Sequence, residues 1–99
     1  MPAWLIADIE VTDTAGYDEY RRRVPEMVAA YGGHFVIRGG PALALEGAWQ
    51  PRRIVVIEFA TIERLLAFYD SAEYAPLKAL RMAASDSRMI AVDGDVGDG

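Results

Sequence analysis

The stretch from Tyr31 to Phe59 constrains the fold more than any other part of the sequence. Residues 34–38 and 54–59 are rich in β-branched and aromatic side chains and are separated by glycine and proline, a pattern typical of neighbouring strands. Gly39 and Gly40 follow the first run directly and predict a bulge or bend, because an interior glycine disturbs regular pairing. We therefore expect this stretch to form the middle of a small sheet.

The patterns on either side complete the fold. Alternating hydrophobicity predicts strands at residues 3–11 and 88–93. Apolar residues at helical spacing predict a helix at residues 15–31 and a helical region at 62–84, in which Asp70-Ser71 ends one helix and can cap another. Pro25 removes a backbone donor, so we expect a kink or short break near residues 21–24. Residues 42–46 are expected to be extended before a turn at 47–51, and residues 85–87 to form a loop. The order βαββαβ predicts a ferredoxin-like α+β domain, with helices on one face of a four-stranded antiparallel sheet.

Length and composition bound the domain and its partners. A chain of 99 residues forms one domain, which we assign to residues 1–93, followed by a flexible acidic tail at 94–99. The net charge of −5 argues against nucleic-acid binding, and the basic cluster Arg21–Arg23 is expected to be a solvated helix face. No signal peptide or membrane-spanning run is evident, and the lack of cysteine fits a reducing cytoplasm. We therefore expect a cytoplasmic protein without nucleic-acid or membrane partners.

A sheet with helices on one face leaves its other face uncovered. The side chains expected on that face are Trp4, Ile6, Val36, Ile54 and Val56, with Met89 and Ala91 from the last strand. Leaving a large apolar side chain in water forgoes about 1.5–3 kcal/mol, and several of them together rival the stability of a small domain. The sequence predicts no third helix that could cover this face. A second copy of the same sheet can cover it instead, which predicts a homodimer packed sheet to sheet.

Several short motifs occur in one order along the chain. They are Tyr31-Gly-Gly-x-Phe-x-x-Arg-Gly-Gly, Leu45-Glu-Gly-x-Trp-x-Pro-x-Arg, Ile57-Glu-Phe and Tyr69-Asp-Ser-x-x-Tyr. Together they resemble the uncharacterised domain-of-unknown-function family numbered 1330, and the resemblance covers nearly the whole chain up to Asp93. The sequence departs from the family at His34, where Arg or Lys is more usual, and at Ala60-Thr61, which stand in place of Pro-Ser.

The resemblance implies a fold and an assembly more than a reaction. The family is placed among the dimeric α+β barrels, whose ferredoxin-like subunits pack sheet to sheet. The wider superfamily includes cofactor-free monooxygenases, haem-degrading enzymes and small-molecule isomerases, so a reaction type does not follow from the fold. The departure at His34 puts any borrowed anion-binding role at that position in doubt.

The candidate catalytic residues are four polar groups on the mixed face of the predicted sheet, namely Asp8, His34, Arg38 and Glu58. A histidine beside a carboxylate can act as an acid/base pair, since burial and a charge partner move pKa values toward neutrality. The same groups can instead form an ion-pair cluster that sets the register of the dimer. We favour the ion-pair interpretation, which does not exclude the other.

The candidate ligand-binding residues are the aromatic residues Tyr17, Tyr20, Trp49 and Tyr69. The tyrosines lie on helical stripes that face the sheet, where their hydroxyls can reach a pocket. Aromatic residues at helical spacing are more often plain core, with hydroxyls at its edge. Trp49 lies in a turn and is either a cap over a pocket mouth or, as we favour, an anchor on the partner subunit.

Two classes of function therefore remain open. One is a non-catalytic dimeric module that binds a small metabolite, and the other is a cofactor-free monooxygenase-like or isomerase-like enzyme acting on a small molecule. A single histidine cannot build a multi-histidine metal site, and His34 on a strand fits haem ligation poorly. We expect no metal and no cofactor.

Overall fold

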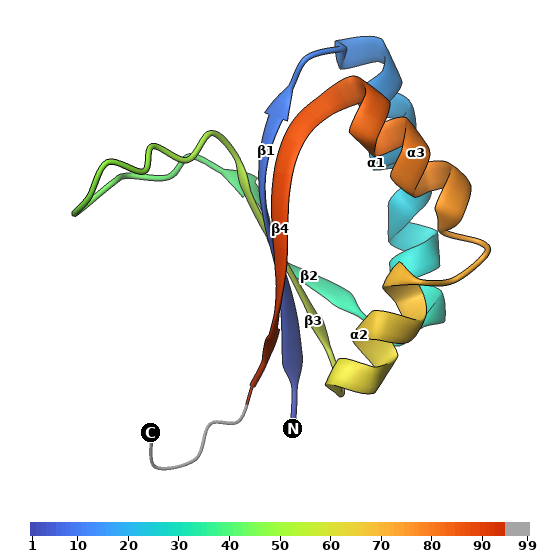
Figure 1. Cartoon of the computed structure of the whole chain (residues 1–99). Coiled ribbons are helices and arrows are strands. Elements are labelled where there is room, and N and C mark those ends of the chain that lie inside the picture. The colour runs from blue at the N-terminus through green and yellow to red at the C-terminus, as the bar shows by residue number, and fades with distance from the viewer. Residues whose placement is uncertain (95–99) are drawn as a thin grey trace.

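The hydrophobic patterns of the chain produce a sheet with helices on one face only (Figure 1). The computed structural model describes residues 1–94. The elements are β1 (Ala3–Val11), α1 (Thr14–Ala30), β2 (His34–Gly40), β3 (Ile54–Phe59), α2 (Ile62–Tyr69), α3 (Ala75–Ala84) and β4 (Ser85–Asp93). The predicted ferredoxin-like α+β fold is confirmed, and the predicted helical region 62–84 consists of two helices.

The sheet has the order β2-β3-β1-β4, and all neighbouring strands are antiparallel. In β1, Leu5 lies opposite Ile57 of β3 and Ala91 of β4, so these side chains share one face. That face packs against the helices. The largest fully buried side chains are Tyr74, Phe59, Phe68, Leu65, Leu77 and Val28. The core therefore lies between the sheet and the three helices.

The other face of the sheet carries large apolar side chains that no helix covers. This open face consists of Trp4, Ile6, Val36, Ile37, Ile54, Val56, Ile90 and Val92. The expectation that Met89 and Ala91 belong to it is wrong, because Met89 pairs with Ala7 and packs against the core. Residues 89–92 are all apolar, so alternation alone could not distinguish their two faces.

Two other predicted features are corrected by the structure. α1 runs without a break from Thr14 to Ala30 although Pro25 lies inside it. Four buried side chains hold this helix on the sheet, and at about 1.5–3 kcal/mol each they outweigh the roughly 3 kcal/mol that an interior proline costs. They are Tyr17, Tyr20, Val24 and Val28. The predicted loop at 85–87 is strand, because β1 is long enough to pair with β4 from Ser85 onward.

Strand β2 contains an extra residue near its start. Phe35 pairs with Ile57 of β3 and Ile37 pairs with Val56, so Val36 is a bulge residue between the two pairs. Side chains alternate along a strand, and one extra residue moves those that follow to the opposite face. Phe35 therefore lies on the core face and Ile37 on the open face.

A second bulge lies at the glycines that end β2. Gly39 is unpaired between the partnered residues Arg38 and Gly40, and its φ of +89° is in the left-handed region that favours glycine. A side chain at Gly39 would also collide with the guanidinium of Arg53. The predicted bulge is confirmed, and the special backbone conformation belongs to Gly39.

Residues 41–53 form an arm that joins β2 to β3. The arm projects on the side of the sheet away from the helices (Figure 1). It contains no strand, so the segment at 42–46 that was expected to be extended pairs with no neighbour. Leu43 and Leu45 are 84% and 86% exposed. The arm therefore adds exposed apolar surface on the same side as the open face.

The C-terminal end of the described chain stays attached to the sheet. Gly94 is buried, and its N–H donates to the carbonyl of Pro2 at 2.8 Å. Gly94 is the first residue of the tail predicted at 94–99, and the rest of that tail, 95–99, lies outside the described residues.

Gly39→Ala is expected to lower the free energy of unfolding by about 1–3 kcal/mol, because alanine must adopt the left-handed conformation and displace Arg53. Gly40→Ala is the matched control, since a Cβ there meets no atom within 4 Å and no left-handed φ is required. Urea denaturation measures both. Equal losses of stability in the two variants would show that Gly39 has no special role.

Candidate functional site

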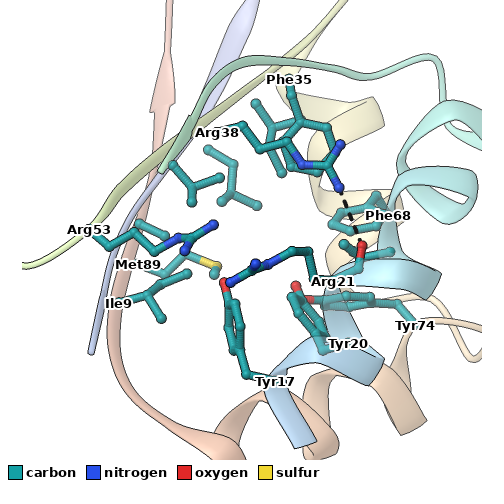
Figure 2. A pocket seen from close by; sticks show the side chains of 15 residues that line it. Ile9, Tyr17, Tyr20, Arg21, Phe35, Arg38, Arg53, Phe68, Tyr74 and Met89 are labelled. Atoms are coloured by element: carbon teal, nitrogen blue, oxygen red, sulfur yellow. Dashed lines mark hydrogen bonds between the residues drawn. The ribbon is translucent and has the colours of Figure 1, made fainter. Parts of the chain in front are cut away.

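A pocket opens between α1 and the sheet, toward the edge formed by β2 and β3 (Figure 2). We call it the helix–sheet pocket. Its polar lining residues are Tyr17, Tyr20, Arg21, Arg38, Arg53 and Tyr74, and its apolar walls include Leu5, Ile9, Phe35, Phe68 and Met89. The cavity measures about 30 Å³, and a water molecule needs about 10–15 Å³ on such a measure. As it stands, the pocket holds only a compact group.

Three arginines reach this pocket from different parts of the chain. Figure 2 shows Arg21 extending from α1 and Arg53 from the sheet toward each other, with Arg38 above them. The guanidinium carbons of Arg21 and Arg53 lie 5.3 and 5.7 Å from the centroid of the Tyr17 ring. That of Arg38 lies 4.6 Å from the centroid of Phe35. Cation–π contacts of this kind orient the guanidinium groups around the cavity.

Arg38 lies on the helix side of the sheet because of the bulge at Val36. It pairs with Val55, a buried residue of the core face. The expectation that Arg38 shares a face with His34 and Glu58 is therefore wrong. Strict alternation from His34 would place Arg38 on the open face. The bulge adds one residue to the strand and so reverses the faces of the residues that follow it.

Pro25 leaves free the acceptor that binds Arg38. Proline has no N–H, so the carbonyl of Arg21, four residues earlier in the helix, loses its usual hydrogen bond. Arg38 Nη2 donates to that carbonyl at 3.3 Å. Pro25, which was expected to interrupt α1, thus frees a carbonyl that lets Arg38 of β2 hydrogen-bond to the helix.

Hydrogen bonds to β1 hold the backbone of Arg53, and this sets the position from which its side chain extends into the pocket. Its carbonyl accepts the N–H of Ile9 in β1 at 2.9 Å, and its N–H contacts Asp8 Oδ1 at 3.4 Å. The side chain then passes over Gly39, which has no Cβ to block it. The glycine bulge and the attachment to β1 together place this guanidinium.

Two of the arginines have unfilled hydrogen-bonding capacity. Within residues 1–94, three arginine Nε atoms are buried without an acceptor: those of Arg21 and Arg53, which line the pocket, and that of Arg81, which does not. Arg21 Nη1 lies 3.8 Å from the carboxylate of Asp18 in an exposed pair, and no ion pair of Arg38 or Arg53 occurs in this part of the chain. Buried polar groups normally have partners. The pocket is thus electropositive and has donors without acceptors.

Tyrosine hydroxyls meet at the back of the pocket. Tyr20 Oη and Tyr74 Oη are 2.8 Å apart in a buried hydrogen bond. Arg81 is 2% exposed, and its Nη1 donates to Ser87 Oγ at 2.6 Å. Burial, followed by the neighbouring Tyr74, raises the pKa of Tyr20, and burial also raises the pKa of Tyr17. Tyr17 and Tyr20 therefore remain neutral hydroxyls at physiological pH.

His34 and Glu58 lie opposite each other on β2 and β3, but on the open face. His34 is exposed, and among residues 1–94 no hydrogen bond or ion pair joins it to Glu58. Glu58 instead accepts a hydrogen bond from Trp4 Nε1 at 3.1 Å. The predicted polar cluster is not assembled within one chain, and neither residue lines the helix–sheet pocket.

Asp8 holds the base of the arm. Its carboxylate accepts hydrogen bonds from Trp49 Nε1 at 3.0 Å, from the N–H of Arg52 at 2.9 Å and from that of Arg53 at 3.4 Å. Desolvation by itself would raise the pKa of Asp8. These three hydrogen bonds, with the positive charge of Arg88, outweigh it and lower that pKa below its ordinary value.

The predicted ligand-binding aromatic residues divide into two pairs. Tyr17 and Tyr20 line the helix–sheet pocket. Trp49 lies on the arm, 56% exposed, and contributes to grooves on the open side of the sheet. Tyr69 lies away from the pocket, with Lys78 Nζ 3.8 Å from its ring centroid. The pocket therefore contains only the first pair.

Arg21 and Arg53 were not recognised as site residues from the sequence. The other two arginines of the basic cluster are exposed as expected, whereas Arg21 follows Tyr17 by four residues and shares its buried side of α1. Arg53 precedes Val55 and Ile57 in the alternation of β3, which places it on the core side. These spacings are the signals that could have identified both residues.

Comparison with known proteins places the chain in a family. The family model described as "Domain of unknown function (DUF1330)" matches residues 2–95. Among curated proteins, none matches this chain.

Solved structures share the fold at low sequence identity. The RPA0582 protein of unknown function from Rhodopseudomonas palustris is 19% identical, with a TM-score of 0.76 over 93% of this chain and 81% of that one. SnoaB, a cofactor-independent oxygenase from Streptomyces nogalater, is 15% identical, with a TM-score of 0.67 over 94% of this chain and 92% of that one. These similarities show a common ferredoxin-like architecture.

Asp8→Asn is expected to reduce stability by about 1 kcal/mol at pH 7, because the hydrogen bonds to a charged acceptor are weakened. A lowered pKa in the folded state means that the contribution of Asp8 is present above the ordinary Asp value of about 3.9 and is lost as the pH falls through the folded value. Thermal unfolding at a series of pH values measures the difference between wild type and variant. Asp86→Asn serves as an exposed control. A difference that does not shrink in acid would contradict this role.

Proposed function

The chain belongs to the DUF1330 family of domains of unknown function, and we propose that it is a homodimeric binding protein for a small metabolite. The ligand occupies the helix–sheet pocket. The observation that carries this proposal is the convergence of three guanidinium groups and three tyrosines, from α1, β2, the end of the arm and the α2–α3 connection, on one cavity. Pockets with apolar walls and a few convergent polar groups are the usual form of small-molecule sites.

The open face supports the homodimer. Its exposed apolar residues include Val36 at 52%, Ile37 at 43% and Ile90 at 60%. Exposed patches of this kind mark interfaces, and the arm extends the apolar surface on the same side of the sheet. A second copy covers both, with the partner's sheet against this one. Trp49 and the unpaired His34 then lie at or near the interface.

We assign the dimer to the cytoplasm. The chain has no cysteine, which matches a reducing compartment. Among the described residues, no helix has the length and hydrophobicity needed to cross a membrane.

Oxygenation without a cofactor is the second candidate function, favoured by the structural similarity to SnoaB. Chemistry that begins by removing a proton from the substrate needs a general base within about 2.6–3.2 Å. The lining of the helix–sheet pocket contains no histidine and no carboxylate, and the raised pKa of Tyr17 and Tyr20 makes them poor bases near neutral pH. Binding is therefore the function that the geometry supports better. Oxygen consumption with a hydroquinone substrate tests the alternative.

Ile90→Asp is expected to weaken the dimer at least about tenfold, because it places an unpaired charge in an apolar interface. Met82→Asp is the matched control, since Met82 is 57% exposed against 60% for Ile90 but lies on α3. Sedimentation equilibrium measures both. A wild-type protein that is monomeric at micromolar concentration, or equal dissociation constants for the two variants, would contradict dimerisation through this face.

Phe35→Trp is expected to weaken binding of small compounds at least about tenfold, because the larger ring fills part of the cavity. The measurement is saturation-transfer NMR with a library of compact fragments. Tyr31→Trp enlarges an aromatic residue outside the lining and should leave binding unchanged. The proposal fails if fragments bind equally to both variants or if none binds the wild type.

A further inference from the structure

We propose that the ligand of the helix–sheet pocket is a small organic oxyanion, such as a carboxylate or an enolate. It is held by the guanidinium groups of Arg21, Arg38 and Arg53. This inference rests on the proposed binding function and adds the chemical class of the ligand.

The pocket supplies hydrogen-bond donors and almost no acceptors. A guanidinium has five N–H donors and cannot accept. The lining contains three guanidinium groups and no carboxylate, amide or imidazole side chain. A hydrogen-bond donor on the ligand would find almost no acceptor in this lining, whereas an oxyanion offers several lone pairs to the guanidinium groups.

The buried Nε atoms show that this capacity is not used by the chain. Stacking on Tyr17 accounts for the orientation of Arg21 and Arg53, and the carbonyl freed by Pro25 accounts for one nitrogen of Arg38. Neither explains why Arg21 Nε and Arg53 Nε are buried without an acceptor among residues 1–94. An acceptor placed between these two side chains, which extend toward each other in Figure 2, would satisfy both.

The electrostatics of the pocket also favour an anion. Like charges brought together around a small cavity repel unless a counter-charge lies between them. Three guanidinium groups surround this cavity, and Arg81 adds a fourth, buried positive charge behind Tyr74. The chain as a whole carries −5, so this concentration of positive charge is a local feature. The cavity volume of about 30 Å³ restricts the anion to a compact or planar one.

The test compares matched ligands that differ in charge and little in shape. Isothermal titration calorimetry is performed with acetate and acetamide, and with benzoate and benzamide, at pH 7 and low salt. At least one carboxylate is expected to bind about tenfold or more tightly than its amide, since charge-assisted hydrogen bonds are stronger than neutral ones. Arg21→Gln should abolish that preference, and Arg22→Gln, next to it on the exposed side of α1, should retain it. Arg53→Gln and Arg52→Gln form a second such pair.

Equal affinity for the members of each pair would overturn the oxyanion assignment and leave the proposed binding function standing. A carboxylate preference that is the same in Arg21→Gln and Arg22→Gln would also overturn it, because the anion would then bind elsewhere. If no member of either pair binds while fragments that Phe35→Trp excludes do bind, the oxyanion assignment alone fails. If neither probes nor fragments bind, both proposals fail.

Discussion

The extra residue in β2 is the constraint on which the site depends. A strand presents alternate residues to opposite faces, so the bulge at Val36 decides which residues reach the helices and which stay on the open face. Without it, Arg38 would lie beside Glu58 on the open face. With it, Arg38 joins Arg21 and Arg53 on the core side, where its guanidinium meets Phe35 and the carbonyl of Arg21. One inserted residue therefore places Arg38 on the core side and leaves His34 and Glu58 on the open face.

Local irregularities elsewhere support the same arrangement. Pro25 removes one helical hydrogen bond, and the carbonyl it frees is the one that Arg38 binds. Gly39 tolerates a left-handed φ and leaves room for the side chain of Arg53. Asp8 fastens the arm to β1 and so fixes the backbone of Arg53. Pro25 and Gly39 each weaken regular secondary structure, and all three features contribute to placing a guanidinium in the pocket.

The sequence predicted the fold well and the site in part. Hydrophobic periodicity identified every strand and helix, since burial on one face imposes it, and it also identified the uncovered face of the sheet. Tyr17 and Tyr20 were recognised because they lie on a regular helical stripe. The assignment of Arg38 failed because a bulge is not visible in an alternating pattern. The faces of Met89 and Ala91 were assigned wrongly because residues 89–92 are all apolar. Arg21 was concealed within a run of arginines whose other members are exposed.

The most direct test of a pocket organised around these arginines is the side-chain ¹H–¹⁵N NMR spectrum of arginine Nε–H groups during titration with benzoate. We predict that the Nε–H resonances of Arg21 and Arg53 shift in a saturable manner, because their unpaired donors acquire an acceptor. Those of Arg22 and Arg23, which lie on the exposed side of α1, should stay in place. Unchanged Arg21 and Arg53 signals at saturating benzoate, or equal shifts of all four, would contradict an arginine-lined oxyanion site between α1 and the sheet.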